Sequence, residues 1–134
     1  DRAAAARLGA PLGHDFCVIN LSDNLKPWSI IETRLRLAVE ADFAMAFYNP
    51  RSKARPEGFE KALDLLKRSC EKERLIMFAR AVSTPEESLL TVALSDATPD
   101  MADMRTMVLL GSRQTRLIPR KNAAPIVYTP RSIR

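Results

Sequence analysis

The chain has 134 residues, of which 46% are hydrophobic and 28% are charged, with 21 Lys and Arg against 16 Asp and Glu for a net charge of +5. This is the size of one ordinary domain that can bury a core without a metal or disulfide, so the composition excludes a disordered chain, a collagen-like repeat and a small disulfide scaffold. The apolar runs are far shorter than the ~20 residues of a membrane helix, so we expect no membrane partner.

The positive charge is concentrated near the C-terminal end. Six of the 21 basic residues follow Ser112 with no acidic residue among them, which leaves 15 basic and all 16 acidic groups in residues 1–112. A nearly neutral body with a basic, proline-containing end is typical of a solvated tail, so we interpret residues 119–134 as a basic tail. Nucleic-acid binding is the least favoured alternative, because Tyr128 is the one aromatic residue of this segment that could stack on bases.

The first part of the chain predicts alternating helices and strands. Residues 1–8 are rich in alanine and precede Gly9, which indicates a helix that ends at a glycine. Residues 15–21 form an apolar, partly β-branched run that predicts a buried strand. Pro27 then opens an amphipathic helix, and residues 43–48 predict a second buried strand.

The rest of the chain continues this alternation. A second amphipathic helix follows Pro56, and residues 75–79 predict a third strand. Residues 83–87 predict a turn, because they combine hydroxyl side chains, a proline and two acids. The remaining elements are strands at 88–94 and 106–110 and a short helix at 99–104.

This order of elements indicates an α/β protein with a central mixed sheet of about five strands flanked by helices. The polar residues 22–26 predict a linker between two units. We therefore expect residues 1–25 to be the end of a preceding domain and residues 26–118 to form a second domain, followed by the basic tail.

Residues that commonly carry catalysis or bind metals are sparse. The chain has one histidine, and Cys17 and Cys70 lack the spacing of metal ligands, so we expect no metal site. Free thiols in a reducing compartment are the simplest interpretation, which favours a cytoplasmic protein. The four glycines are scattered and form no phosphate-binding loop. No catalytic residue is identified.

Three strand ends are candidates for binding a small molecule, because ligands of open α/β sheets bind beyond the ends of strands. These ends are Tyr48-Asn49-Pro50, Arg80-Ala81-Val82-Ser83 and Gly111-Ser112. Their small and polar residues suit recognition of a flat group such as adenine through main-chain hydrogen bonds. From the pattern alone, ordinary loops are the simpler interpretation.

Two segments carry a resemblance to a known family. They are His14-Asp15-Phe16 leading to Leu21-Ser22-Asp23, and Phe47-Tyr48-Asn49-Pro50-Arg51-Ser52-Lys53. With residues 104–116, they resemble the class III S-adenosylmethionine-dependent tetrapyrrole methyltransferases over roughly residues 2–118. Within this family the likeness is strongest to the enzymes of cobalamin biosynthesis that methylate C17 of precorrin-3B.

The resemblance implies S-adenosylmethionine as the methyl donor, S-adenosylhomocysteine as the product and an anionic tetrapyrrole as the substrate. The implied reaction is displacement at the sulfonium methyl by a ring carbon, accompanied by contraction of the macrocycle. Such a transfer depends more on alignment of the reacting atoms than on acid–base groups.

Matching positions to the family also implies two sets of site residues. The implied cofactor contacts are Tyr48, Asn49, Ala81, Val82, Gly111 and Ser112. The implied substrate contacts are Arg51, Lys53 and Arg55, a group of cations suited to carboxylates; a solvated loop is an equal alternative. The family is richer in glycine than this chain at residues 81–84.

Finally, the resemblance implies a larger protein. Family members are nearly twice as long, consist of two α/β domains with the cofactor between them, and form homodimers. The chain therefore matches the C-terminal domain of such an enzyme, and we expect it to be inactive alone. The alternatives are another precorrin or cobalt-precorrin methylase, and a non-catalytic domain of the same fold that binds an adenine ligand or dimerises.

Overall fold

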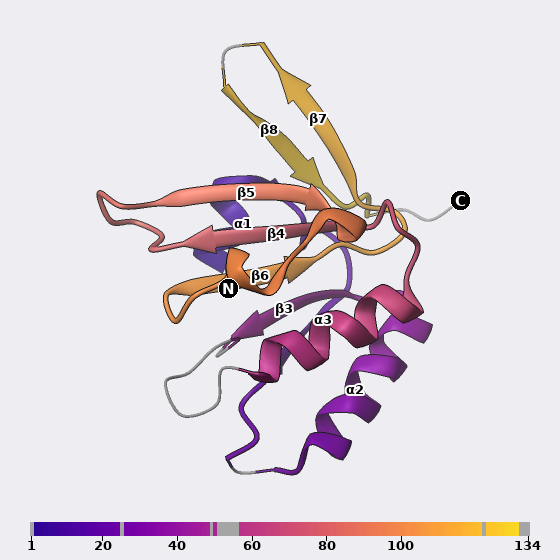
Figure 1. Cartoon of the computed structure of the whole chain (residues 1–134). Coiled ribbons are helices and arrows are strands. Elements are labelled where there is room, and N and C mark those ends of the chain that lie inside the picture. Colours follow the sequence, from indigo (N-terminus) through magenta and orange to yellow (C-terminus); the bar gives the residue numbers. More distant parts are fainter. Residues whose placement is uncertain (1, 25, 49, 51–56, 122, 132–134) are drawn as a thin grey trace.

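The computed structural model describes residues 2–24, 26–48, 50, 57–121 and 123–131 (Figure 1). Within this part of the chain the helices are α1 (Arg2–Leu8), α2 (Trp28–Glu40) and α3 (Glu57–Ser69). The strands are β1 (Gly9–Ala10), β2 (Phe16–Asn20), β3 (Ala44–Tyr48), β4 (Leu75–Arg80), β5 (Ser88–Ala93), β6 (Thr106–Leu110), β7 (Arg116–Arg120) and β8 (Ala123–Tyr128). Two 3-10 turns, η1 (Leu94–Asp96) and η2 (Pro99–Met101), link β5 to β6.

The central sheet has five strands in the order β2-β3-β6-β4-β5. β2 and β3 run parallel, whereas β6 lies antiparallel between β3 and β4, and β5 lies antiparallel to β4. The mixed sheet of about five strands flanked by helices is therefore confirmed. The short helix expected at residues 99–104 is reduced to the single turn η2.

One face of the sheet packs against α2 and α3. Side chains alternate along a strand, so Phe47, Phe78 and Val108 all point to this face and are buried with the apolar stripes of the two helices. The ring of Phe59 from α3 meets the ring of Phe78 edge to face, with centroids 6.1 Å apart. Burial of each such side chain contributes about 1.5–3 kcal/mol, so this layer is the main core.

The opposite face carries smaller side chains and is covered in part by α1. Ala46, Ala79 and Leu109 form this face and pack with Ala4 and Leu8 of α1. Figure 1 shows α1 behind the sheet, on the side away from α2 and α3. The small residues let the helix approach the strands closely.

Residues 2–20 belong to the same folded unit as the rest of the described chain. β2 pairs with β3 along its whole length, from Phe16 beside Ala44 to Asn20 beside Tyr48. This differs from the expectation that residues 1–25 are the end of a separate domain. The polar residues 22–24 connect β2 to α2 within one folded unit. In the sequence, such a polar connection looks the same as a linker between domains.

The hairpin formed by β7 and β8 replaces the solvated tail expected at residues 119–134. Figure 1 shows it extending from the body of the sheet. β8 pairs in parallel with β1, Val127 is fully buried, and the N–H of Thr129 donates to the C=O of Ala10 at 2.9 Å. The sequence analysis missed β8 because its apolar residues at 126–127 are close in sequence to several cations, which suggested a solvated tail. Residues 132–134 lie outside the described part.

Gly9 is the point where α1 ends and the chain passes close to β8. The predicted helix end at this glycine is confirmed, and Gly9 adopts a φ of +127°. A Cβ added here would lie 2.5 Å from the carbonyl oxygen of Val127. The position therefore requires glycine for both backbone conformation and space.

We predict that Gly9→Ala lowers the free energy of unfolding by about 1–3 kcal/mol from backbone strain, with a further cost from the contact to Val127. Urea unfolding followed by circular dichroism would measure this. Gly58→Ala in α3 is the matched control, because its Cβ would meet only the Leu21 carbonyl at 3.4 Å and alanine favours a helix. Equal stabilities of Gly9→Ala and the unmodified chain would contradict the prediction.

Candidate functional site

The sheet order brings three chain segments together at one edge. β3 and β4 point in the same direction because each is antiparallel to β6, so both end where β6 begins. Arg80 is paired with Thr106, and Phe47 is paired with Val108. Tyr48, Ala81 and the start of β6 therefore meet at the same edge.

A hollow of about 430 Å³, here called the strand-end hollow, lies at this edge. Tyr48 is 39% exposed and forms part of its wall, whereas Ala4 and Ala79 are buried beneath it. The remaining lining residues come from the turn after β4 and from the start of β6. They are Ala81, Val82, Thr84, Met104, Arg105, Thr106 and Met107.

The turn after β4 is strained in a way that alanine and serine rarely tolerate. Ala81 has a φ of +51° and Ser83 a φ of +67°, both in the left-handed region that favours glycine. Such conformations cost about 1–3 kcal/mol each and are enriched at functional sites. The family resemblance implied a glycine-rich turn here, and these angles are of the kind that glycine adopts.

Hydrogen bonds hold Ala81 in place within this turn. Its N–H donates to the C=O of Arg105 at 3.0 Å, and its C=O accepts from the N–H of Thr84 at 3.1 Å and from the Thr84 hydroxyl at 2.7 Å. Among the described residues, the N–H and C=O of Val82 have no such partner. Val82 thus offers a main-chain donor and acceptor beside the hollow, between two residues of fixed conformation.

A carboxylate and a helix side chain hold the other end of the turn. Glu87 accepts the N–H of Ser83 at 2.8 Å, and Arg7 of α1 donates to both Glu87 and the Ser83 hydroxyl at 3.3 Å. The Ser83 N–H, with the Arg7 guanidinium, keeps the pKa of the Glu87 carboxyl below its usual range. The position of α1 is therefore coupled to the shape of the turn.

Gly111 and Ser112 lie at the opposite edge of the sheet. Leu110, just before them, is paired with Ile76 and Met45 near the starts of β4 and β3. The five residues of β6 separate the two edges by about 17 Å at a rise of ~3.3 Å per residue. The structure therefore does not bring Gly111 and Ser112 together with the strand-end hollow.

The buried guanidinium of Arg74 anchors this second edge. It donates to the C=O of Gly111 at 3.1 Å, pairs closely with Glu71, and lies 3.8 Å from the carboxylate of Asp42. Its hydrogen bond lowers the pKa of Glu71. The Ser112 N–H donates to the Thr115 hydroxyl at 2.9 Å, so the Gly111-Ser112 turn has an evident structural role.

The remaining implied site residues cannot be placed. Asn49, Arg51, Lys53 and Arg55 lie outside the described residues. Conversely, the structure adds Arg105, Thr106 and Met107 to the hollow, which sequence reasoning missed. Finding them would have required the direction of β6 in the sheet. Because β6 is antiparallel to β3 and β4, its first residues lie beside the last residues of those two strands.

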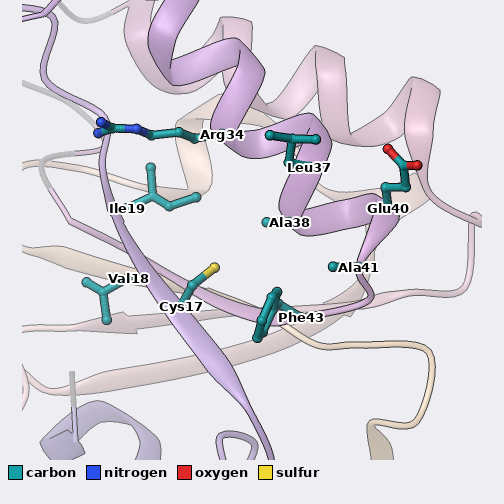
Figure 2. Close-up of a pocket in the computed structure, with 9 residues that line it drawn as sticks. All are labelled: Cys17, Val18, Ile19, Arg34, Leu37, Ala38, Glu40, Ala41 and Phe43. Carbon is teal, nitrogen blue, oxygen red and sulfur yellow. The ribbon is translucent and has the colours of Figure 1, made fainter.

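A second hollow, here called the edge groove, has a volume of about 860 Å³ and lies between β2 and the exposed side of α2. Figure 2 shows Arg34, Leu37 and Glu40 along its helix side, with Cys17 and Val18 on the strand side. It contains none of the implied cofactor or substrate residues.

Other kinds of site are not found in the described part of the chain. No group of three or more His, Cys, Asp or Glu side chains is placed to bind a metal ion there. The described helices include none with the length and apolarity needed to cross a membrane. Cys17 and Cys70 are free and half-buried, and burial raises the pKa of both thiols.

The fold is that of an α/β domain with a hollow at the ends of its strands. Residues 2–98 match the family of tetrapyrrole (corrin/porphyrin) methylases. The chain belongs to this family.

Two curated relatives and one solved structure show how closely the chain follows particular members. It is 50% identical to a precorrin-3B C(17)-methyltransferase of Sinorhizobium over 96% of this chain and 51% of the relative. It is 42% identical to a probable cobalt-factor III C(17)-methyltransferase of Salmonella typhimurium, over 84% of this chain and 47% of the relative.

The crystal structure of the methyltransferase CobJ superposes with a TM-score of 0.88 at 62% identity, covering 96% of this chain and 52% of CobJ. The chain thus spans about half the length of the proteins it matches.

Proposed function

We propose that this chain is the C-terminal half of an S-adenosylmethionine-dependent methyltransferase that methylates C17 of precorrin-3B, or of its cobalt-containing counterpart, in cobalamin biosynthesis. The observation that carries the proposal is the meeting of Tyr48, Ala81 and Val82 around one hollow. These residues were implied as cofactor contacts by family resemblance alone, and they come from the end of β3 and from the turn after β4. The 50% identity to a C17-methyltransferase supports the choice of reaction.

The residues around the hollow fit an adenosyl ligand. Ala79 and Ala81 leave space for a flat ring, Tyr48 supplies an aromatic wall, and the main chain of Val82 supplies a donor and an acceptor. S-adenosylmethionine contributes an electrophilic methyl group on a sulfonium. The chain contributes orientation, which is what an in-line methyl transfer chiefly requires. The remaining half of the longer protein would complete the surroundings of the cofactor.

The cofactor proposal predicts that this chain binds S-adenosylhomocysteine and that Ala81→Val weakens binding at least tenfold, or about 1.4 kcal/mol. Valine is β-branched and strongly disfavours the φ of +51° that the turn requires. Isothermal titration calorimetry would measure both affinities. Ala93→Val is the matched control, because Ala93 lies in the extended strand β5, paired with Leu75 at the far end of β4. No binding by the unmodified chain would contradict the prediction that this half holds the cofactor by itself.

We also propose that a group of cations binds the carboxylates of the tetrapyrrole. Arg51, Lys53 and Arg55 follow Tyr48 closely in the sequence, and Arg105 lines the hollow as an exposed cation. Replacing Arg51, Lys53 and Arg55 together by alanine should weaken binding of uroporphyrin III, used as an anionic tetrapyrrole probe, most strongly at low salt. Fluorescence titration would measure it. Unchanged affinity at low salt would contradict the assignment.

We propose self-association through the edge groove, with a second copy of the chain as the partner. Leu37 is 59% exposed and lies near the C-terminal end of α2, midway between Arg34 and Glu40. A two-fold axis at Leu37 would place each Arg34 opposite Glu40 of the other copy. The outer side of β2 also faces no other strand among the described residues. The same patch is therefore self-complementary in both charge and apolar character.

Sedimentation equilibrium would test this surface. Leu37→Lys and Arg34→Glu should each weaken the dimer, and the double variant Arg34→Glu with Glu40→Arg should restore it because the charge pair is only reversed. Ile30→Lys is the control, because Ile30 is exposed on the same helix but lies outside the groove. A monomeric unmodified chain, or a double variant as weak as the single one, would contradict the proposal.

The free thiols of Cys17 and Cys70 suit the reducing cytoplasm, where we place the protein. A disulfide at Cys17 or Cys70 in protein isolated under alkylating conditions, which trap free thiols as thioethers, would contradict this placement.

A further inference from the structure

A carboxylate outside the wall of the strand-end hollow is hydrogen-bonded to two of the segments that form it. Asp103 lies in the turn just before β6 and is about half exposed. One of its oxygens accepts from the Arg80 guanidinium at 2.5 Å. The other accepts from the N–H of Arg105 at 2.8 Å and from the Thr106 hydroxyl at 2.9 Å. Asp103 thus joins the end of β4 to the start of β6.

Both connections lead directly to Ala81. Arg80 is the residue before Ala81, so fixing its side chain restrains the chain as it enters the turn. The C=O of Arg105 is the acceptor for the Ala81 N–H, and the Arg105 N–H is held by Asp103. Asp103 therefore restrains Ala81 from its own strand and from the neighbouring strand.

Ala81 needs this restraint because its backbone has a φ of +51°, in the left-handed region. A non-glycine residue in the left-handed region persists only when its surroundings hold it there. At the far end of the turn, Ser83 is held by Glu87 and by Arg7, whose side chain is 50% exposed. The contacts of Asp103 are shorter than those of Arg7 and include a partly buried hydroxyl. The Arg80 guanidinium, by its hydrogen bond, also keeps the pKa of Asp103 below its usual range, so the carboxylate is charged near neutral pH.

We propose that Asp103 is a positioning residue for the cofactor site, which holds Ala81 in its left-handed conformation and so presents the main chain of Val82 to the ligand. The inference rests on the proposed function, because it assigns the ligand of this hollow as an adenosyl compound. Asp103 is not among the residues that line the hollow, so its effect on binding is exerted through the turn.

Two variants separate the ion pair of Asp103 with Arg80 from its other hydrogen bonds. Asp103→Asn preserves the size of the side chain and one oxygen acceptor for Arg105, but it loses the ion pair with Arg80. Asp103→Ala loses every contact. Glu32→Gln is the matched control. It removes a carboxylate on α2 that lies 4.0 Å from the Arg36 guanidinium and does not line the hollow.

The first measurement is calorimetric titration of the chain with S-adenosylhomocysteine, accompanied by the melting temperature of each variant. We expect Asp103→Ala to weaken binding at least tenfold and Asp103→Asn several-fold, with Glu32→Gln unchanged. A purely structural role would lower the melting temperature and leave the affinity of the folded protein unaltered. Equal affinities of Asp103→Asn and the unmodified chain would overturn the inference, even if Asp103→Ala failed to fold.

The second measurement needs no ligand. Amide hydrogen exchange by NMR should show the Ala81 N–H exchanging at least tenfold faster in Asp103→Asn than in the unmodified chain, while amides in the middle of β4 stay protected. If the unmodified chain does not bind S-adenosylhomocysteine, this half does not hold the cofactor by itself, and Ala81 exchange alone then decides whether Asp103 holds the turn. Unchanged protection of Ala81 would overturn the inference.

Discussion

The position of β6, antiparallel between two strands that run in the same direction, is the constraint on which the rest of this structure depends. Its hydrogen bonds to β3 and β4 bring the ends of those strands to one edge. Its alternating side chains join two apolar layers, with Val108 on the face of α2 and α3 and Leu109 on the face of α1. The strand-end hollow exists because the first residues of β6 meet the last residues of its neighbours.

Local patterns were sufficient to predict the elements of the sheet, because each strand is a short apolar run bounded by polar or turn-forming residues. They were insufficient at both ends of the chain. Residues 16–20 pair with β3 across the intervening helix α2, and Val127 and Tyr128 of β8 pair with β1 from more than a hundred residues away. Such pairings depend on contacts that no local window contains, and the cations around Val127 disguised a buried strand as a tail.

The position of the strand-end hollow was predictable to the extent that the hollow lies at strand ends. Tyr48, Ala81 and Val82 meet around one hollow because both of their strands end at the same edge. Gly111 has the same appearance in sequence, yet it ends a strand of opposite direction and therefore lies beside the buried Arg74. Strand direction is set by the whole sheet, so sequence reasoning could not separate Gly111 from the others or find Arg105.

The choice of alanine and serine over glycine at the two left-handed positions of the turn has an entropic consequence. Glycine would enter these conformations without strain, but it would also visit many others, so a ligand would have to order the turn when it bound. Ala81 and Ser83 have fewer accessible conformations, and the cost of selecting the right one is met when the domain folds. A turn made in this way is rigid before any ligand arrives, so ligand binding energy is not spent on ordering it.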